Sequence, residues 1–323
     1  MIDRRQFLAG AASSALVLAS GAARAAEWPE RLVRLVVPFP PAGAIDVVAR
    51  LVAPTLQQIW GKDVVIENKP GAGGNIGNEL VARAAPDGYT LLLTQSGIVV
   101  NQFLYPKLSY DPVADLAPVS LLALVPNIMV VPASSPAKTV EEFIAYARSK
   151  TLSYGSAGNG TSSHMCGEMF KRQVGVEMTH VPYRGSAPAL NDLIPGRLDV
   201  MIDSVSGLVP HIRSGSLRAL GVTAKRPLAV LPKLRPLADS ALPGFDAAGL
   251  VAALAPARTP PEIVAKIQKD FSTALFEPAT QKRLEDLGDE VIGSPPQVLA
   301  QYIKFEMNKW GPLIKEAKIG LDG

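Results

Sequence analysis

The fold is decided by two stretches, Arg34-Leu35-Val36-Val37-Pro38-Phe39-Pro40-Pro41-Ala42-Gly43-Ala44 and Leu152-Ser153-Tyr154-Gly155-Ser156-Ala157-Gly158-Asn159-Gly160-Thr161-Ser162-Ser163. Each stretch passes from a short strand-like run into a turn of small residues and then into a helical pattern. Such a turn aims backbone N–H groups and a helix N-terminus at one point. Two of these turns facing each other across a cleft would hold an anionic small molecule without any catalytic side chain.

Alternating strand and helix patterns surround both turns. In the first half, β-branched or apolar runs predict strands at 32–37, 63–67 and 89–94. The segments between them predict helices at about 45–59 and 75–85. In the second half, Thr139-Val140-Glu141-Glu142 is a capping box that starts a helix. Further elements are predicted at 152–155, from about 163, at 176–181, after Ser186 and at 200–202. The fold class is therefore α/β, built from two βαβ series.

Two crossovers are expected between these series. An extended apolar stretch at 119–131, broken by Pro126, leads into the second series, and a return is expected near 247–254. A second capping box, Thr259-Pro260-Pro261-Glu262, predicts a helix that packs back on the first series. We therefore predict two domains, residues 26–124 plus 248–323 and residues 125–247, with a hinge at the crossovers; a mature chain of about 300 residues favours such a division.

The first 25 residues have the pattern of an export signal. Arg4 and Arg5 precede an apolar run of small residues, and Ala23-Arg24-Ala25 is an A-x-A cleavage site. The paired arginines fit a twin-arginine signal, although a Sec signal can look similar. We therefore expect a mature protein in the periplasm.

Charge and composition exclude several function classes. The formal net charge is +3, and removing residues 1–25 lowers it to +1, so the basic footprint of a nucleic-acid-binding protein is missing. His164, His180 and His211 lack metal-ligand spacing, and no G-x-S-x-G or H-E-x-x-H motif occurs. Cys166 has no matched base, which favours an inert thiol. No catalytic residue, metal or cofactor is predicted.

Polar groups at the strand ends extend the candidate site. Thr94-Gln95-Ser96 ends a strand of the first series, at the edge where α/β sheets bind ligands. Asp203 occupies the corresponding place in the second series, where it could orient a loop N–H or accept from a ligand. His164 could donate to an anion or serve as a structural hydrogen-bonding group. Gly71-Ala72-Gly73-Gly74-Asn75-Ile76-Gly77 fails the dinucleotide pattern and fits either a packed turn or the mouth of the cleft.

A resemblance joins these features. The sequence resembles the Bug family of periplasmic solute-binding proteins, the receptors of tripartite tricarboxylate transporters, from about Arg34 to Tyr302. Six segments carry the resemblance: Pro38–Asp46 with Ala49-Arg50, Glu67–Gly74, Ala85–Leu91, Gly158–Thr161, His180-Val181-Pro182-Tyr183-Arg184-Gly185, and Ala255-Pro256 with Thr259-Pro260.

The resemblance implies a two-domain periplasmic binding protein of the type II, Venus-flytrap class, with each domain a mixed sheet flanked by helices. It also implies that the two domains close on a carboxylate, held partly through ordered waters. Carried over residue by residue, the implied ligand contacts are Phe39, Pro40, Pro41, Ala42, Gly43, Ala44, Thr94, Gln95, Ser96, Ser156, Ala157, Gly158, Asn159, Gly160, Thr161, Ser162 and Asp203.

Three positions depart from the family pattern. The family usually has Gly where Ala42 stands, a polar residue where Ile45 stands, and Trp where Leu250 aligns. Ile45 adds apolar surface, and Leu250 widens the wall. We therefore expect a ligand less polar than an amino acid or citrate, such as an aromatic or medium-chain dicarboxylate.

The function expected is that of a monomeric receptor that captures a carboxylate and delivers it to a membrane permease of the tripartite tricarboxylate type. An alternative is a ligand sensor that docks on a sensor kinase. An enzyme acting on a carboxylate is a further, less favoured alternative.

Overall fold

The first strand set is a parallel trio. The computed structural model describes residues 28–316 and 319–320; the predicted signal at 1–25 lies outside them. Strand β1 (Val33–Val37) lies between β2 (Val64–Asn68) and β3 (Thr90–Thr94). Leu35, Val36 and Val37 are fully buried, because a central parallel strand is covered on both faces. The three strands predicted here are confirmed to within one residue at each end.

Two long strands join this trio to a second strand set. Strands β4 (Leu116–Pro132) and β9 (Ala248–Pro256) run antiparallel, and β9 also pairs with β3. They are the two expected crossovers. The prediction that Pro126 breaks the first crossover is wrong, because β4 continues through it. Pro126 is the last residue of β4 paired with β9, and pairing with the second set begins at Asn127, so the missing N–H falls where the strand changes partner.

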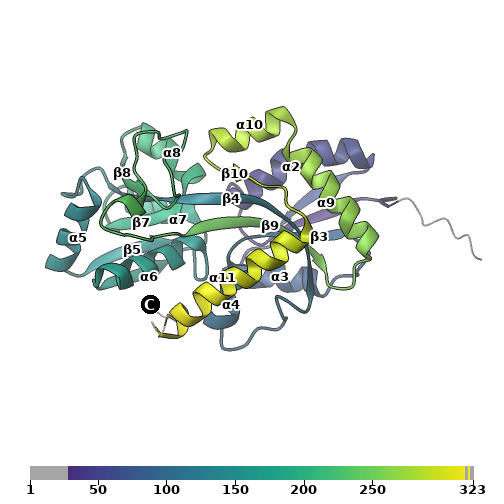
Figure 1. Ribbon diagram of the computed structural model, residues 1–323, viewed down its shortest axis with the longest axis horizontal. Helices are drawn as coiled ribbons and strands as arrows, with labels where there is room; N and C mark the ends of the chain where they lie inside the picture. The colour runs from purple at the N-terminus through teal and green to yellow at the C-terminus, as the bar shows by residue number, and fades with distance from the viewer. Residues whose placement is uncertain (1–27, 317–318, 321–323) are drawn as a thin grey trace, which may run out of the picture.

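The second strand set continues the same sheet. Strand β7 (Val200–Ser204) lies between β4 and β5 (Leu152–Ser156), and β6 (Met178–Pro182) is parallel to β5 at the edge. The strand order is β2-β1-β3-β9-β4-β7-β5-β6, and Figure 1 shows β4 and β9 bridging the two halves. Two further strands pair with β4: β8 (Leu217–Val222) and the short β10 (Glu290–Val291).

Helices cover the sheet in both halves (Figure 1). They are α2 (Ala44–Trp60), α3 (Asn75–Ala82), α4 (Gly97–Leu104), α5 (Val140–Ser149), α6 (Ser162–Val174), α7 (Ser186–Leu193), α8 (Val205–Arg213), α9 (Pro261–Leu275), α10 (Pro278–Asp286) and α11 (Pro296–Glu316), with 3-10 turns at Ala72–Gly74 and Leu237–Asp239.

The two predicted capping boxes differ in outcome. At α5, Thr139 Oγ1 accepts from Glu142 N at 3.2 Å, as expected, whereas the Glu142 carboxylate accepts from Lys138 N. The prediction of a capping box at α9 is wrong. The N-cap there is Pro260, and the Thr259 hydroxyl donates back to Pro256 O at 2.8 Å. Pro261 still opens the helix, because its fixed φ suits the first helical position.

Helix α9 packs on the first strand set, as predicted. Its buried residues Ile267 and Phe271 belong to one apolar cluster with Val48 and Leu56 of α2. The Trp60 Nε1–H donates to Asp270 Oδ2 at 2.7 Å and ties the two helices together. This packing holds α2, and with it the turn at its N-terminus, against β1.

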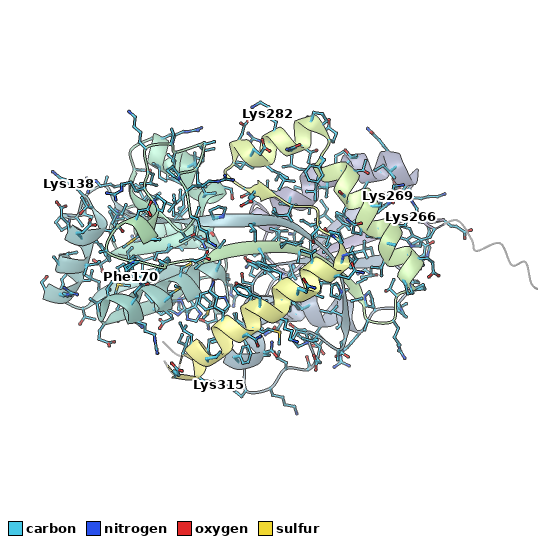
Figure 2. The ribbon with its side chains drawn as sticks, in the orientation of Figure 1. Lys138, Phe170, Lys266, Lys269, Lys282 and Lys315 are labelled. Atoms are coloured by element: carbon cyan, nitrogen blue, oxygen red, sulfur yellow. The ribbon has the colours of Figure 1, made fainter. Side chains whose placement is uncertain are left out.

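Charged side chains are spread over the outside. In Figure 2 the labelled lysines lie at the rim on different elements, with Lys138 before α5, Lys282 on α10 and Lys315 on α11, whereas Phe170 of α6 is fully buried. Helix α11 crosses in front of β9 (Figure 1), and its Glu316 accepts from Arg172 of α6 at 2.8 Å. The C-terminal helix therefore touches both halves.

Candidate functional site

The turn between β1 and α2 is held by one buried carboxylate. Asp46, in the first turn of α2, accepts from Ala42 N at 2.9 Å, from Asn68 Nδ2 at 3.0 Å and from Arg50 Nε at 2.8 Å. Asn68 also donates to Phe39 O at 3.0 Å. Burial acts to raise the pKa of Asp46, but these hydrogen bonds and the charge of Arg50 hold it below its usual value. Asp46 is thus an ionised anchor for the turn.

This geometry leaves N–H groups of α2 available. The first intrahelical bond is donated by Val47 to Gly43 O, so the N–H groups of Ala44 and Ile45 have no intrahelical partner. The N-cap, Gly43, has no side chain to cap them. The positive end of the helix dipole adds to the attraction of these groups for an anion.

The turn between β5 and α6 uses most of its own donors internally. Ala157 N donates to Ser163 Oγ at 2.9 Å, Gly158 N to Ser156 Oγ at 3.1 Å, and Gly160 N to His164 Nδ1 at 3.2 Å. The sequence suggested that N–H groups of this turn face a ligand; in the structure these three are donated within the second half of the molecule. At the start of α6 the Thr161 hydroxyl accepts a hydrogen bond from His164 N. The N–H groups of Ser162 and Ser163 have no intrahelical partner.

Two stacked imidazole rings pack against this second turn. His180 Nε2 and Ser156 Oγ are 2.6 Å apart, and the rings of His164 and His180 stack with centroids 4.2 Å apart. Burial, followed by the charge of Lys171, lowers the pKa of His164 to about 4; burial, followed by the neighbouring His164, lowers that of His180 to about 3. Of the two roles considered for His164, the structure favours the structural one.

A cavity of about 120 Å³ lies between the two turns. Six segments contribute: the β1–α2 turn, the residue after β3, the β5–α6 turn with the start of α6, the turn between β6 and α7, the end of β7, and the crossover strands. The lining residues are Phe39, Pro40, Pro41, Ala42, Gly43, Ala44, Ile45, Asp46, Gln95, Val125, Ala157, Thr161, Ser162, Arg184, Gly185, Ser186, Ala187, Pro188, Asp203, Ser204, Gly249, Leu250 and Val251.

Three charged residues line the cavity, each in a different state. The negative charge of Asp46 is balanced by its ion pair with Arg50. Asp203 is 4% exposed; its Oδ1 accepts from Ser204 N at 2.7 Å, and its Oδ2 has no hydrogen-bond partner among the described residues. Burial raises the pKa of Asp203 to about 6, and the nearby Ser186 hydroxyl and Ser204 N–H offset this only partly. Arg184 is exposed.

The predicted contacts fall into two groups. Those that line the cavity are Phe39, Pro40, Pro41, Ala42, Gly43, Ala44, Gln95, Ala157, Thr161, Ser162 and Asp203. Those outside its lining are Thr94, Ser96, Ser156, Gly158, Asn159 and Gly160. The Thr94 hydroxyl, for example, donates to Asn78 Oδ1 at 3.0 Å within the core. The role of each residue as a ligand contact stays a prediction.

Sequence reasoning omitted several lining residues. They are Ile45 and Asp46 in the first turn of α2, Val125 on β4, Arg184–Pro188 after β6, Ser204, and Gly249–Val251 on β9. A signal existed for some of them, since the segment ending in Tyr183-Arg184-Gly185 carried the family resemblance, and Ile45 and Leu250 stood out as departures. The crossover strands gave no local signal, because their apolar residues look like ordinary core.

Glycines bring the two halves into contact beside the cavity. A Cβ on Gly73 would lie 2.6 Å from Asn159 O, and a Cβ on Gly160 would overlap Asn101 Oδ1. The glycine-rich segment 71–77 thus packs against the β5–α6 turn without lining the cavity. On another side, a Cβ on Gly288 would lie 2.8 Å from Val205 of α8.

Other chemistry is weakly supported. Cys166 is fully buried, and burial raises the pKa of its thiol to about 12, as expected for an inert thiol. Among the described residues, no group of three or more His, Cys, Asp or Glu side chains could hold a metal ion. Within residues 28–316 and 319–320, no helix combines the length and apolar character needed to span a bilayer.

Comparisons with known proteins place this architecture. The chain is 39% identical to a UPF0065 protein encoded in the tcbD-tcbE intergenic region of Pseudomonas sp. strain P51, over 98% of this chain and 96% of that one. A Rhodopseudomonas palustris protein solved with adipate is 37% identical, with a TM-score of 0.87, covering 90% of this chain and 99% of that one. MatC of the same organism, solved with malate, is 36% identical, with a TM-score of 0.84, covering 89% and 100%.

These likenesses identify the architecture as the α/β periplasmic binding protein fold. The family model described as "Tripartite tricarboxylate transporter family receptor" matches residues 48–320. The chain therefore belongs to the family of tripartite tricarboxylate transporter receptors.

Proposed function

We propose that this chain is a periplasmic solute-binding receptor, not an enzyme, that captures an organic carboxylate in the cavity between its two strand sets. It acts as a monomer and delivers the ligand to a membrane permease of the tripartite tricarboxylate type. The observation that carries the proposal is the convergence of two helix N-termini, those of α2 and α6, on one largely apolar cavity.

The energetics of such a site are sufficient for capture. Hydrogen bonds to a charged group contribute about 1.5–3 kcal/mol each, and a helix N-terminus adds about 0.3–1 kcal/mol. Three or four N–H or hydroxyl contacts to one carboxylate therefore suffice for micromolar affinity, about −8 kcal/mol, after the loss of translational freedom. The solved relatives with adipate and malate support carboxylates as the ligand class.

The cavity walls favour a ligand with an apolar middle. Ile45, Leu250 and Val251 are aliphatic residues of the cavity lining, and Leu250 is almost fully buried. An aromatic or medium-chain dicarboxylate gains from contact with these side chains, whereas citrate or aspartate would leave polar groups without partners. In this proposal residues 26–124 with 248–323 and residues 125–247 are the two domains, and they close on the ligand by bending at β4 and β9.

The experiment is a binding screen on the mature protein, unfolded and refolded to remove any carried-over ligand. The panel contains mono-, di- and tricarboxylates, aromatic acids and amino acids, followed by calorimetry on each hit. A ligand at 100 times its dissociation constant should raise the free energy of unfolding by about 2.7 kcal/mol, which is a clear thermal shift. Tighter binding of citrate or aspartate than of adipate or terephthalate would refute the ligand class, and turnover of a bound acid, seen by mass spectrometry, would refute a pure receptor role.

A further inference from the structure

One residue of the cavity lining carries a charge that no described residue pairs with. Arg184 follows β6, lines the cavity and is exposed, and among the described residues it forms no ion pair or side-chain hydrogen bond. Other arginines are paired; Arg50 with Asp46 and Arg197 with Asp192, both at 2.8 Å, are examples. Within the part of the chain that the structure describes, Arg184 is also the only Lys or Arg that lines the cavity.

The backbone that carries Arg184 is held on both sides. Tyr183 N donates to Ser156 O at 3.1 Å, and Gly185 N donates to Ala157 O at 3.1 Å. The Tyr183 hydroxyl donates to Asp192 Oδ2 at 2.7 Å. Although the guanidinium reaches solvent, its Cα is therefore fixed on the β5–α6 turn, and little backbone order is lost when the side chain meets a partner.

The opposite wall of the cavity lies close to this turn. A Cβ on Gly185 would lie 3.7 Å from Pro40 Cγ, so the Arg184 turn faces the β1–α2 turn directly. The first carboxylate of a ligand is assigned above to the N–H groups at the starts of α2 and α6. A guanidinium at the edge of the same cavity can meet a second carboxylate bidentately, which a point-charge ammonium cannot do.

The acidic groups of the cavity make this arrangement selective. Asp46 is already neutralised by Arg50 and does not compete for Arg184. Asp203 is buried with one oxygen unpartnered, so a ligand carboxylate next to it would face a second acidic group without an intervening cation. The second negative charge of a ligand is therefore best placed at Arg184.

We infer that Arg184 is a specificity-determining residue that pairs with the second carboxylate of a dicarboxylate, so that the cavity prefers dicarboxylates over the matching monocarboxylates. This inference rests on the proposed capture of carboxylates. The aliphatic wall of Ile45 and Leu250 then contacts the carbon skeleton that joins the two carboxylates.

The test compares two matched ligand pairs, adipate with hexanoate and terephthalate with benzoate, by calorimetry on the wild type, R184Q and R184K. The wild type should bind at least one dicarboxylate about tenfold or more tightly than its monocarboxylate partner. R184Q should lose that preference while its monocarboxylate affinity changes less than about twofold. R184K should keep part of the preference, because its charge remains and its bidentate geometry does not. Added salt should weaken dicarboxylate binding in the wild type more than in R184Q.

R258Q is the matched control, because Arg258 is also exposed and lies outside the cavity lining. It should leave every affinity within about twofold, so that a general effect of net charge is excluded. The inference is overturned if both ligand pairs show no preference in the wild type, or if R184Q keeps the preference. The proposed function fails in a different way, namely if no carboxylate of the wider panel binds the wild type.

Discussion

The Cα of Gly160 lies directly against the side-chain oxygen of Asn101, so that a Cβ at Gly160 would overlap Asn101 Oδ1. Gly160 lies in the β5–α6 turn of the second strand set, and Asn101 lies in α4 beside the first. Asn101 is itself held, because its Nδ2 donates to Asn75 Oδ1 at 2.8 Å and to Gly73 O at 3.1 Å. The two halves of the molecule thus meet through a contact that only glycine permits.

The variant G160A should destabilise this contact. Gly160 has a φ of 74°, so alanine adds backbone strain of about 1 kcal/mol and a steric overlap besides. The control is G215A, because Gly215 has a φ of 77° with no atom near its missing Cβ. Urea unfolding should show a larger loss for G160A than for G215A. Because an open form would relieve the overlap, G160A should also weaken ligand binding, whereas G215A should not; equal affinities would contradict a closing motion at this contact.

Asp289 should make the protein less stable at neutral and alkaline pH than at acidic pH. It is 5% exposed, both carboxylate oxygens lack hydrogen-bond partners among the described residues, and burial raises its pKa to about 7. The folded-state pKa therefore exceeds the unfolded value of about 3.9, so stability is highest below pH 4 as far as this group is concerned and falls as pH rises through 7. Between pH 5 and pH 8 the wild type should lose roughly 2–3 kcal/mol relative to D289N.

Comparing the two proteins at each pH isolates Asp289. The buried pair His164 and His180 acts in the opposite direction, because their lowered pKa values cost stability as pH falls below about 6.5. Both proteins share this contribution, so it cancels in the difference. Parallel stability curves for wild type and D289N between pH 5 and pH 8 would show that Asp289 is hydrated rather than buried.

The variant A42G should stabilise the protein. Ala42 has a φ of 70°, a left-handed conformation that costs alanine about 1 kcal/mol and glycine almost nothing. Its N–H bond to Asp46 does not involve the side chain and is kept. We expect a gain of about 0.5–1 kcal/mol in urea unfolding. A44G, at the first residue of α2, should bring no gain, because Ala44 already has a helical conformation, and an equal gain for both variants would contradict the backbone argument.

The variant L250W should shorten the accepted ligand. Leu250 is buried on β9 and belongs to the cavity lining, so the larger indole there should crowd the cavity. Calorimetry with succinate, glutarate, adipate and pimelate should show the optimum moving to a shorter chain. V65W is the control, because Val65 is exposed on β2 and outside the cavity. An unchanged optimum in L250W would place the ligand skeleton away from Leu250.

The sequence predicted those elements whose signals are local. The apolar run Leu35-Val36-Val37 and the cap at Thr139 each depend on neighbours in the chain, and both were found as expected. The cap predicted at Thr259 is not formed, because two prolines move the helix start by one residue. The threonine hydroxyl donates to Pro256 O instead. The prediction that Pro126 breaks the strand was wrong, because the effect of a proline depends on which strand lies beside it, and that is a property of the sheet.

The cavity was predicted less completely, for a reason of the same kind. Small, polar residues of the β5–α6 turn suggested exposed donors, yet three of those N–H groups are accepted by Ser156 at the end of β5 and by Ser163 and His164 in the first turn of α6. Arg184 and Leu250 come from segments far apart in the chain, and only the packed sheet brings them to one cavity. Local composition cannot report either fact.

The Asp46 network has an evolutionary consequence. Asp46, Asn68 and Arg50 hold the β1–α2 turn, whereas Ile45, Arg184 and Leu250 shape the space in front of it, and the two groups share no residue. After a gene duplication, substitutions at the second group can change which ligand a copy accepts while the first group keeps the turn folded. On the proposed function, the preferred carboxylate can therefore change through substitutions that leave the Asp46 network intact.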